Sequence, residues 1–122
     1  MNSHARVVVI GGGVVGVSTL YHLARKGWSD VVLLERKELT SGSTWHAAGL
    51  LPLFNMSYSV GQIHKYSVRF YKELQEETGQ DVGFKTVSNI RLATNRDRMD
   101  EYYQYAGVAE TIGVKVNFLT PD

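Results

Sequence analysis

The amino-acid sequence predicts an α/β fold that opens with a parallel βαβ unit, and three stretches carry this prediction. Residues 6–10, RVVVI, are a β-branched apolar run, which is typical of a strand buried on both faces. Residues 14–26 repeat apolar side chains at helical spacing and stop before Gly27, a residue favoured just after a helix. Residues 31–35, VVLLE, are a second apolar run of the strand type. A strand, a helix and a strand in this order predict two parallel strands joined by a crossover helix.

Residues 37–57 follow as a loop without sustained periodicity, rich in Ser, Gly, Thr and Ala. A loop of this length in a compact domain usually has a function. A long amphipathic helix is expected next, ending at Gly79. The side chains expected on its apolar face are Val60, Ile63, Tyr66, Ser67, Phe70, Tyr71 and Leu74.

The last part of the chain is predicted to hold a small strand pair and one more helix. Residues 84–94 have the composition of a strand or hairpin, with Ser88 and Asn89 at a turn. Asn95 is a favourable N-cap for a helix that stops at Gly113. Residues 114–119 are predicted to form a last short strand.

The composition fits an ordinary globular domain and excludes several classes. The 122 residues are 43% hydrophobic and 20% charged, with a net charge of +1, so neither disorder nor a nucleic-acid surface is indicated. The chain has no cysteine, which excludes thiolate chemistry, and no metal site is predicted. No apolar run reaches the roughly 20 residues that a membrane helix needs. Only residues 1–4 precede the first apolar run, too few for a targeting segment, so a cytoplasmic protein is expected.

Gly11, Gly13 and Gly16 satisfy the pattern G-x-G-x-x-G between the first strand and the helix. The first glycine allows the tight turn, the second lets a pyrophosphate approach the backbone, and the third lets helix and strand pack closely. Glu35 ends the second strand, where a carboxylate accepts hydrogen bonds from a ribose. These features predict a Rossmann-like dinucleotide-binding unit, although the motif does not separate FAD from NAD. The alternative is a glycine-rich turn that binds nothing.

Residues 43–49, STWHAAG, lie in the loop beyond Glu35 and place a Trp and a His before three small residues. With the preceding unit they resemble the FAD-dependent amine oxidoreductases of the D-amino-acid oxidase superfamily, in the branch of sarcosine and dimethylglycine dehydrogenases. The likeness continues through EETGQDVGF (residues 76–84) and IRLATNRDRMDEY (residues 90–102). The FAD-binding domain of that family is discontinuous. The resemblance therefore implies that residues 1–122 are its N-terminal part, incomplete relative to the full fold, with about 84–122 beginning the substrate-binding region.

The resemblance also implies a covalent FAD, attached through His46 to the 8α-methyl group of the flavin. The residues carried over to the pyrophosphate and the adenosine ribose are Gly11, Gly13, Val14, Val15, Gly16, Glu35 and Arg36. Those carried over to the flavin and its phosphates are Gly42, Ser43, Thr44, Trp45, His46, Ala47, Ala48, Gly49 and Leu50. No catalytic residue is assigned within the chain. Taken alone, His46 is typical of a solvated loop histidine or of a core histidine bonded to a carbonyl, and Trp45 of a residue packed under the loop.

The function implied is oxidative N-demethylation of a small N-methyl amino acid, sarcosine or dimethylglycine, with hydride transfer from the N-methyl carbon to the flavin. The alternative is a non-catalytic regulatory relative, like the pyruvate dehydrogenase phosphatase regulatory subunit, which resembles these enzymes without the flavin-attaching histidine. The presence of His46 favours the enzyme. By itself the chain is expected to be inactive, and its uncovered sheet edges favour self-association.

Overall fold

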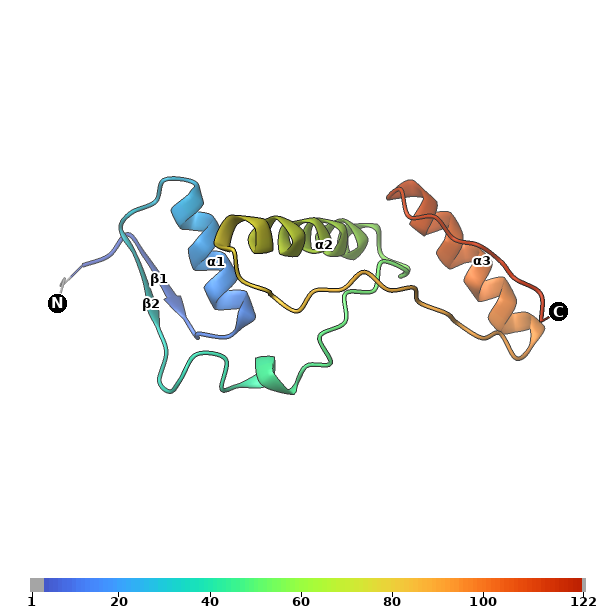
Figure 1. Ribbon diagram of the computed structural model, residues 1–122, viewed down its shortest axis with the longest axis horizontal. Helices are drawn as coiled ribbons and strands as arrows, with labels where there is room; N and C mark the ends of the chain where they lie inside the picture. Colours follow the sequence, from blue (N-terminus) through green and yellow to red (C-terminus); the bar gives the residue numbers. More distant parts are fainter. Residues whose placement is uncertain (1–3, 122) are drawn as a thin grey trace. The chain divides into compact units, whose positions relative to one another are not determined.

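The computed structural model describes residues 4–121, and the chain divides after Leu50 into two compact units. Unit 1 contains the strand β1 (Val7–Ile10), the helix α1 (Val14–Arg25), the strand β2 (Val31–Leu34) and the 3-10 helix η1 (Ser43–His46). Unit 2 contains the helices α2 (Tyr58–Thr78) and α3 (Arg96–Thr111), connected by segments without regular secondary structure (Figure 1). Among the residues described, no helix is long and apolar enough to cross a membrane.

Unit 1 is the predicted βαβ unit. β1 and β2 pair in parallel, with Val7 opposite Val31 and Ile10 opposite Leu34. The helix α1 connects them and packs against the strand pair (Figure 1). Gly27 follows this helix with a φ of 83°, in the left-handed region that favours glycine. The α/β class and the parallel pairing are therefore confirmed.

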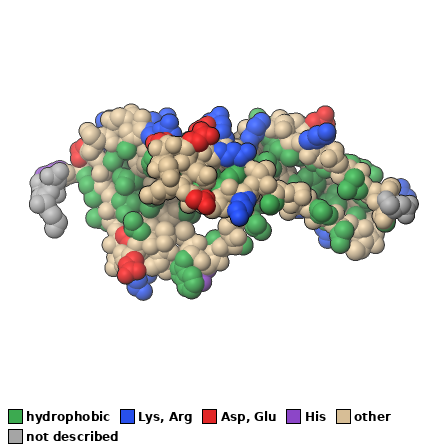
Figure 2. Space-filling view, viewed as in Figure 1, with side chains coloured by type: hydrophobic (Ala, Val, Ile, Leu, Met, Phe, Trp, Pro, Cys, Tyr) green, Lys and Arg blue, Asp and Glu red, His purple; other side chains and the backbone are tan. Residues whose placement is uncertain are grey.

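The prediction that these strands are buried on both faces is wrong. Successive side chains of a strand point to opposite faces, and Val9 lies on the face next to α1. On the other face Ile10 is 85% exposed and Leu34 is 54% exposed. Figure 2 shows hydrophobic side chains at the surface over the region of β1 and β2. A parallel sheet is covered on both faces only when helices pack on both sides, and within unit 1 a single α-helix is described.

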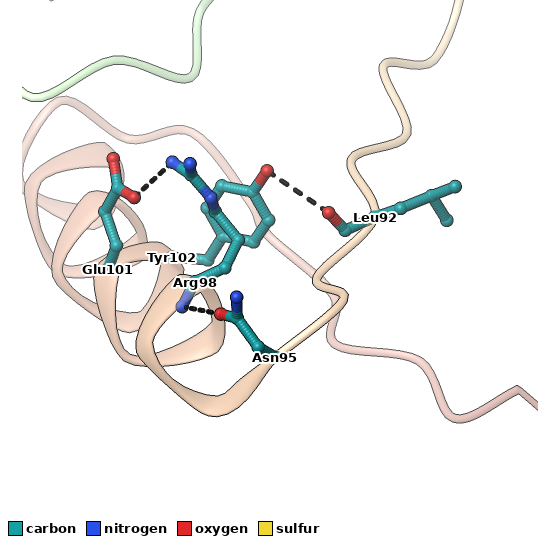
Figure 3. A network of polar contacts seen from close by, with 5 residues as sticks. All are labelled: Leu92, Asn95, Arg98, Glu101 and Tyr102. Atoms are coloured by element: carbon teal, nitrogen blue, oxygen red, sulfur yellow. Dashed lines mark hydrogen bonds and ion pairs between the residues drawn. The ribbon is translucent and has the colours of Figure 1, made fainter.

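The two helices of unit 2 begin and end where the sequence predicts. The hydroxyl of Ser57 accepts from the N–H of Val60 at 3.3 Å at the start of α2, and Gly79 ends this helix with a φ of 67°. Asn95 caps α3, since its Oδ1 accepts from the N–H of Arg98 at 2.8 Å (Figure 3). These caps satisfy backbone groups that a helix end leaves without partners.

The less exposed face of α2 includes four of the predicted residues, Ser67, Phe70, Tyr71 and Leu74, and differs from the prediction in the first half of the helix. Val60, Ile63 and Tyr66 are exposed, whereas Gly61 is buried under the side chain of Ile112, just beyond α3. The less exposed residues around it are His64, Ser67, Val68, Phe70, Tyr71 and Leu74. Gly61 lets Ile112 approach closely because it has no side chain. A glycine contributes little to a hydrophobic pattern, so the pattern selected the neighbouring Val60 and Ile63 and missed Gly61.

The predicted strands at residues 84–94 and 114–119 do not form, and with them the small strand pair is missing. Neither segment pairs with another part of the chain that the structure describes. The side chains of Val87, Ile90 and Leu92 are nearly four-fifths exposed. A strand is stable only with a hydrogen-bonding partner and a covered face. The composition of these segments favours β structure, but it does not show whether a partner strand is present.

Candidate cofactor-binding site

The glycine turn closes tightly between β1 and α1. Gly11 has a φ of 103°, and its N–H donates to the carbonyl of Leu34 at 2.8 Å. A Cβ atom at Gly16 would overlap the carbonyl oxygen of Gly11 and would touch Val9. The first and third glycines of the motif are thus required by backbone conformation and by close packing, respectively.

The N-terminus of α1 presents backbone donors at the end of this turn. The N–H of Val14 donates to the hydroxyl of Thr44 at 2.9 Å. Within the described residues, the N–H groups of Gly13, Val15 and Gly16 have no acceptor. Helix N-termini with free N–H groups and a partial positive charge favour anions. The turn can therefore hold phosphate oxygens, and a glycine at position 13 leaves the backbone open on that side.

Glu35 binds the turn through its carboxylate. Its Oε2 accepts from the N–H of Gly12 at 2.6 Å, and its Oε1 accepts from the N–H of Lys37 at 2.9 Å. These two hydrogen bonds, with the Gly12 bond the stronger cause, lower the pKa of Glu35 below its ordinary value; the charge of Arg36 adds to this, and burial opposes it. A carboxylate has about four acceptor positions, so the ionised group retains capacity for a further donor such as a ribose hydroxyl.

The segment after β2 folds over the turn, which the sequence did not indicate. The N–H of Thr40 donates to the carbonyl of Gly12 at 2.9 Å, and Leu39 lies against Gly12. Thr40 has a φ of 66°, which is unusual for a β-branched residue. Threonine at this position gives no sequence signal for a left-handed conformation, and Gly12 is the variable position of the motif. The contacts of Thr40 and Leu39 with Gly12 could therefore not be predicted from the sequence.

The loop that carries His46 begins with the short helix η1. The Nδ1 of His46 lies 3.1 Å from the carbonyl oxygen of Gly42. The rings of Trp45 and His46 lie 4.0 Å apart between centroids at an angle of 39°. Both side chains are exposed, so Trp45 does not pack under the loop as the sequence alone suggested. The pair forms a small aromatic platform at the surface of unit 1.

The structure brings some of the predicted site residues together and leaves others apart. Thr44 is joined to Val14 at the turn, and Glu35 is joined to Gly12. Arg36, Ser43 and residues 47–50 are exposed, and Gly49 has a φ of 68°. Among the described residues, no three His, Cys, Asp or Glu side chains are grouped closely enough to hold a metal ion.

A parallel strand pair, a glycine turn at a helix N-terminus and an acid after the second strand are the arrangement of a dinucleotide-binding protein. The sequence profile described as "FAD dependent oxidoreductase" matches residues 6–122. The chain belongs to this family of FAD-dependent oxidoreductases, and FAD is the cofactor that the family implies.

Individual relatives agree with this assignment. Dimethylglycine dehydrogenase of Rattus norvegicus is 56% identical over 98 residues, which are 80% of this chain and 11% of the relative. Sarcosine dehydrogenase of Homo sapiens is 45% identical over 120 residues, 98% of this chain and 13% of the relative. The formaldehyde-forming 4-methylaminobutanoate oxidase of Paenarthrobacter nicotinovorans is 38% identical over 98% of this chain and 15% of its own length. The chain thus spans a small part of each of these relatives.

The expectation of a cytoplasmic protein is contradicted by these relatives. The rat and human dimethylglycine dehydrogenases and the human sarcosine dehydrogenase are all named as mitochondrial. The expectation rested on the four residues that precede the first apolar run of the printed sequence. A sequence that matches little more than a tenth of its relatives carries no information about a leader.

Proposed function

We propose that this chain supplies the FAD-binding part of a mitochondrial amine oxidoreductase that oxidatively demethylates sarcosine or dimethylglycine. The relatives named above support the reaction class, since their names specify dimethylglycine, sarcosine and a methylamino acid as substrates. Residues 84–122 begin the substrate-binding region in this proposal. Bound FAD would supply the acceptor for the two electrons removed from the N-methyl carbon.

One observation carries the assignment of the site, namely the hydrogen bond between the N–H of Val14 and the hydroxyl of Thr44. It places the STWHAAG loop beside the phosphate-binding turn, so a single extended cofactor can contact both. The free N–H groups of Gly13 and Val15 would hold the pyrophosphate. Glu35 would accept a ribose hydroxyl, with Arg36 beside it, and residues 42–50 would lie along the flavin.

His46 is suited to hold the flavin covalently because of its hydrogen bond to Gly42. A carbonyl oxygen only accepts, so Nδ1 of His46 carries the hydrogen in this contact. In the neutral imidazole the other nitrogen, Nε2, then has a free lone pair. The ring is exposed, so this nitrogen is accessible as a nucleophile. Covalent attachment through Nε2 of His46 is part of the proposed function.

The second candidate function is a regulatory relative that binds FAD or another nucleotide without turnover. The pyruvate dehydrogenase phosphatase regulatory subunit of Mus musculus is 34% identical over 98% of this chain. The dinucleotide-binding unit alone does not distinguish the two candidates, because it serves many functions. His46 is the feature of this chain that favours the enzyme.

The test is substrate-dependent reduction of a dye by the full-length protein supplied with FAD, with formaldehyde measured in parallel. Sarcosine and dimethylglycine are compared with trimethylglycine, whose quaternary nitrogen has no lone pair to stabilise the oxidised carbon. We expect dye reduction and formaldehyde with at least one of the first two compounds and none with trimethylglycine. FAD that binds but is reduced by neither would favour the regulatory candidate.

A further inference from the structure

The segment 42–50, which carries His46, makes one described hydrogen bond to the rest of unit 1. Thr44 is the only residue of the segment 42–50 that is not exposed. Its Oγ1 accepts from the N–H of Val14 at 2.9 Å. The other hydrogen bonds described for this segment are internal to it. The backbone of Thr40, just before the segment, is bonded to Gly12, and within the segment the hydroxyl of Thr44 is the described link to α1.

Thr44 and His46 belong to the same turn of η1, so they move together. The N–H of Ala47 donates to the carbonyl of Thr44 at 3.2 Å. The imidazole of His46 is held by the carbonyl of Gly42 at 3.1 Å. These contacts close residues 42–47 into one short turn. If the hydroxyl of Thr44 leaves α1, the turn and the imidazole lose their fixed place beside the phosphate-binding site.

We propose that Thr44 is a positioning residue for flavin attachment, which its hydroxyl promotes by anchoring the His46 turn to the N-terminus of α1. This inference rests on the covalent attachment proposed above. Attachment forms a bond from Nε2 of His46 to the carbon of the 8α-methyl group. That carbon loses one hydrogen as a proton, and Nδ1 of His46 gives up its hydrogen as a second proton. The electron pair of the broken C–H bond passes to the ring system, and dioxygen in solution takes up the pair and two protons to form hydrogen peroxide. Holding the nucleophile at the site raises the rate of such a step.

The anchoring role differs from a direct phosphate contact in what it predicts. The N–H groups of Gly13 and Val15 remain available to phosphate while Val14 is bonded to Thr44. If Thr44 only contacted phosphate, its loss would raise the FAD concentration that half-saturates attachment. If Thr44 positions His46, its loss lowers the limiting rate of attachment at saturating FAD. The two roles are therefore separated by the dependence of the rate on FAD concentration.

The experiment compares Thr44→Val and Thr44→Ser in the full-length protein. Valine keeps the shape of the side chain without the hydroxyl, and serine keeps the hydroxyl. Apoprotein is mixed with increasing FAD, and covalent flavin is measured over time as fluorescence in denaturing gels. We expect the limiting rate to fall roughly fivefold in Thr44→Val, the factor that corresponds to a typical net hydrogen bond, and to stay within twofold of wild type in Thr44→Ser. The matched control is Ser41→Ala, which removes an exposed hydroxyl from the same loop but outside the residues assigned to the cofactor.

An unchanged limiting rate in Thr44→Val, or an equal loss in Thr44→Ser, would overturn the inference. Amide hydrogen exchange in the FAD-free protein provides a second measurement that does not need attachment. Peptides covering residues 42–50 should exchange faster in Thr44→Val than in wild type or Ser41→Ala, and equal exchange would also overturn it. Faster exchange together with a wild-type protein that never attaches flavin would retain the anchor and reject covalent attachment instead.

Discussion

At Gly16 the backbone of the turn leaves no room for a methyl group, because a Cβ there would overlap the carbonyl oxygen of Gly11. We predict that Gly16→Ala destabilises the protein by roughly 1–3 kcal/mol or more, the cost of overpacking a closed site, and weakens FAD binding. Gly107→Ala is the matched control, since Gly107 lies in α3 with open space around it. That change should stabilise the helix by up to about 1 kcal/mol. Thermal melts of both variants check the pair, and equal shifts would contradict the account.

The carboxylate of Glu35 makes the turn sensitive to acid. Its pKa in the folded protein is lowered from 4.5, chiefly by the N–H of Gly12. A lowered pKa means that the stabilisation is fully present above the ordinary value and is lost as the pH falls through the lower folded value. We predict that Glu35→Gln is less stable than wild type at neutral pH and that this difference shrinks as the pH falls below the ordinary pKa of 4.5. Denaturant midpoints measured across this range check it, and a difference independent of pH would count against the role of the charge.

The residues of the site divide into those that the sequence could predict and those that it could not. Gly11, Gly16 and Glu35 could be predicted, because the spacing of their motif favours a phosphate-binding turn when a strand precedes it and a helix follows. Thr40 at positive φ and its bond to Gly12 depend on the path of the chain after β2. The anchor at Thr44 depends on where a long loop returns. Local sequence patterns describe neighbouring residues and do not predict where a long loop contacts a distant helix.

At the scale of elements, the caps were the reliable signals. Asn95 accepts from the N–H of Arg98 at 2.8 Å, and nearby Arg98 pairs with Glu101 while the hydroxyl of Tyr102 donates to Leu92 (Figure 3). We predict that Asn95→Ala destabilises unit 2 by about 1 kcal/mol, while Asn95→Asp keeps the cap and most of the stability. Denaturant unfolding of the two variants measures this. Equal loss in both would show that the side-chain oxygen is not the stabilising group.

The predicted strands at residues 84–94 and 114–119 failed at the same scale. Their β-branched and apolar residues favour a strand, but a strand forms only when a second segment supplies the hydrogen bonds. The βαβ unit was predicted correctly because both of its strands lie within one short stretch of sequence, joined by the helix that packs on them. Partners that are distant, or that lie on another part of a protein, leave no trace in a local pattern.

At the scale of the whole molecule, the main feature is the exposed apolar face of the strand pair β1–β2. Val8, Ile10, Val32 and Leu34 form an exposed apolar row on β1 and β2. Such faces promote association. We predict that the isolated 122-residue chain sediments above its mass of 13.6 kDa, and that Ile10→Glu shifts it towards the monomer. Ser41→Glu adds the same charge at an exposed position away from the strands, and if it dissolves the assembly equally well, net charge rather than the apolar face is responsible.

The central claim is that this chain holds FAD with His46 as the point of covalent attachment. The most direct measurement is flavin fluorescence of the full-length protein in a denaturing gel under ultraviolet light. We predict a fluorescent band for wild type and none for His46→Ala. The variant should still bind FAD before denaturation, because the turn at Gly11–Gly16 and the carboxylate of Glu35 do not involve the imidazole. A wild-type band without fluorescence, after exposure to FAD under native conditions, would contradict the claim.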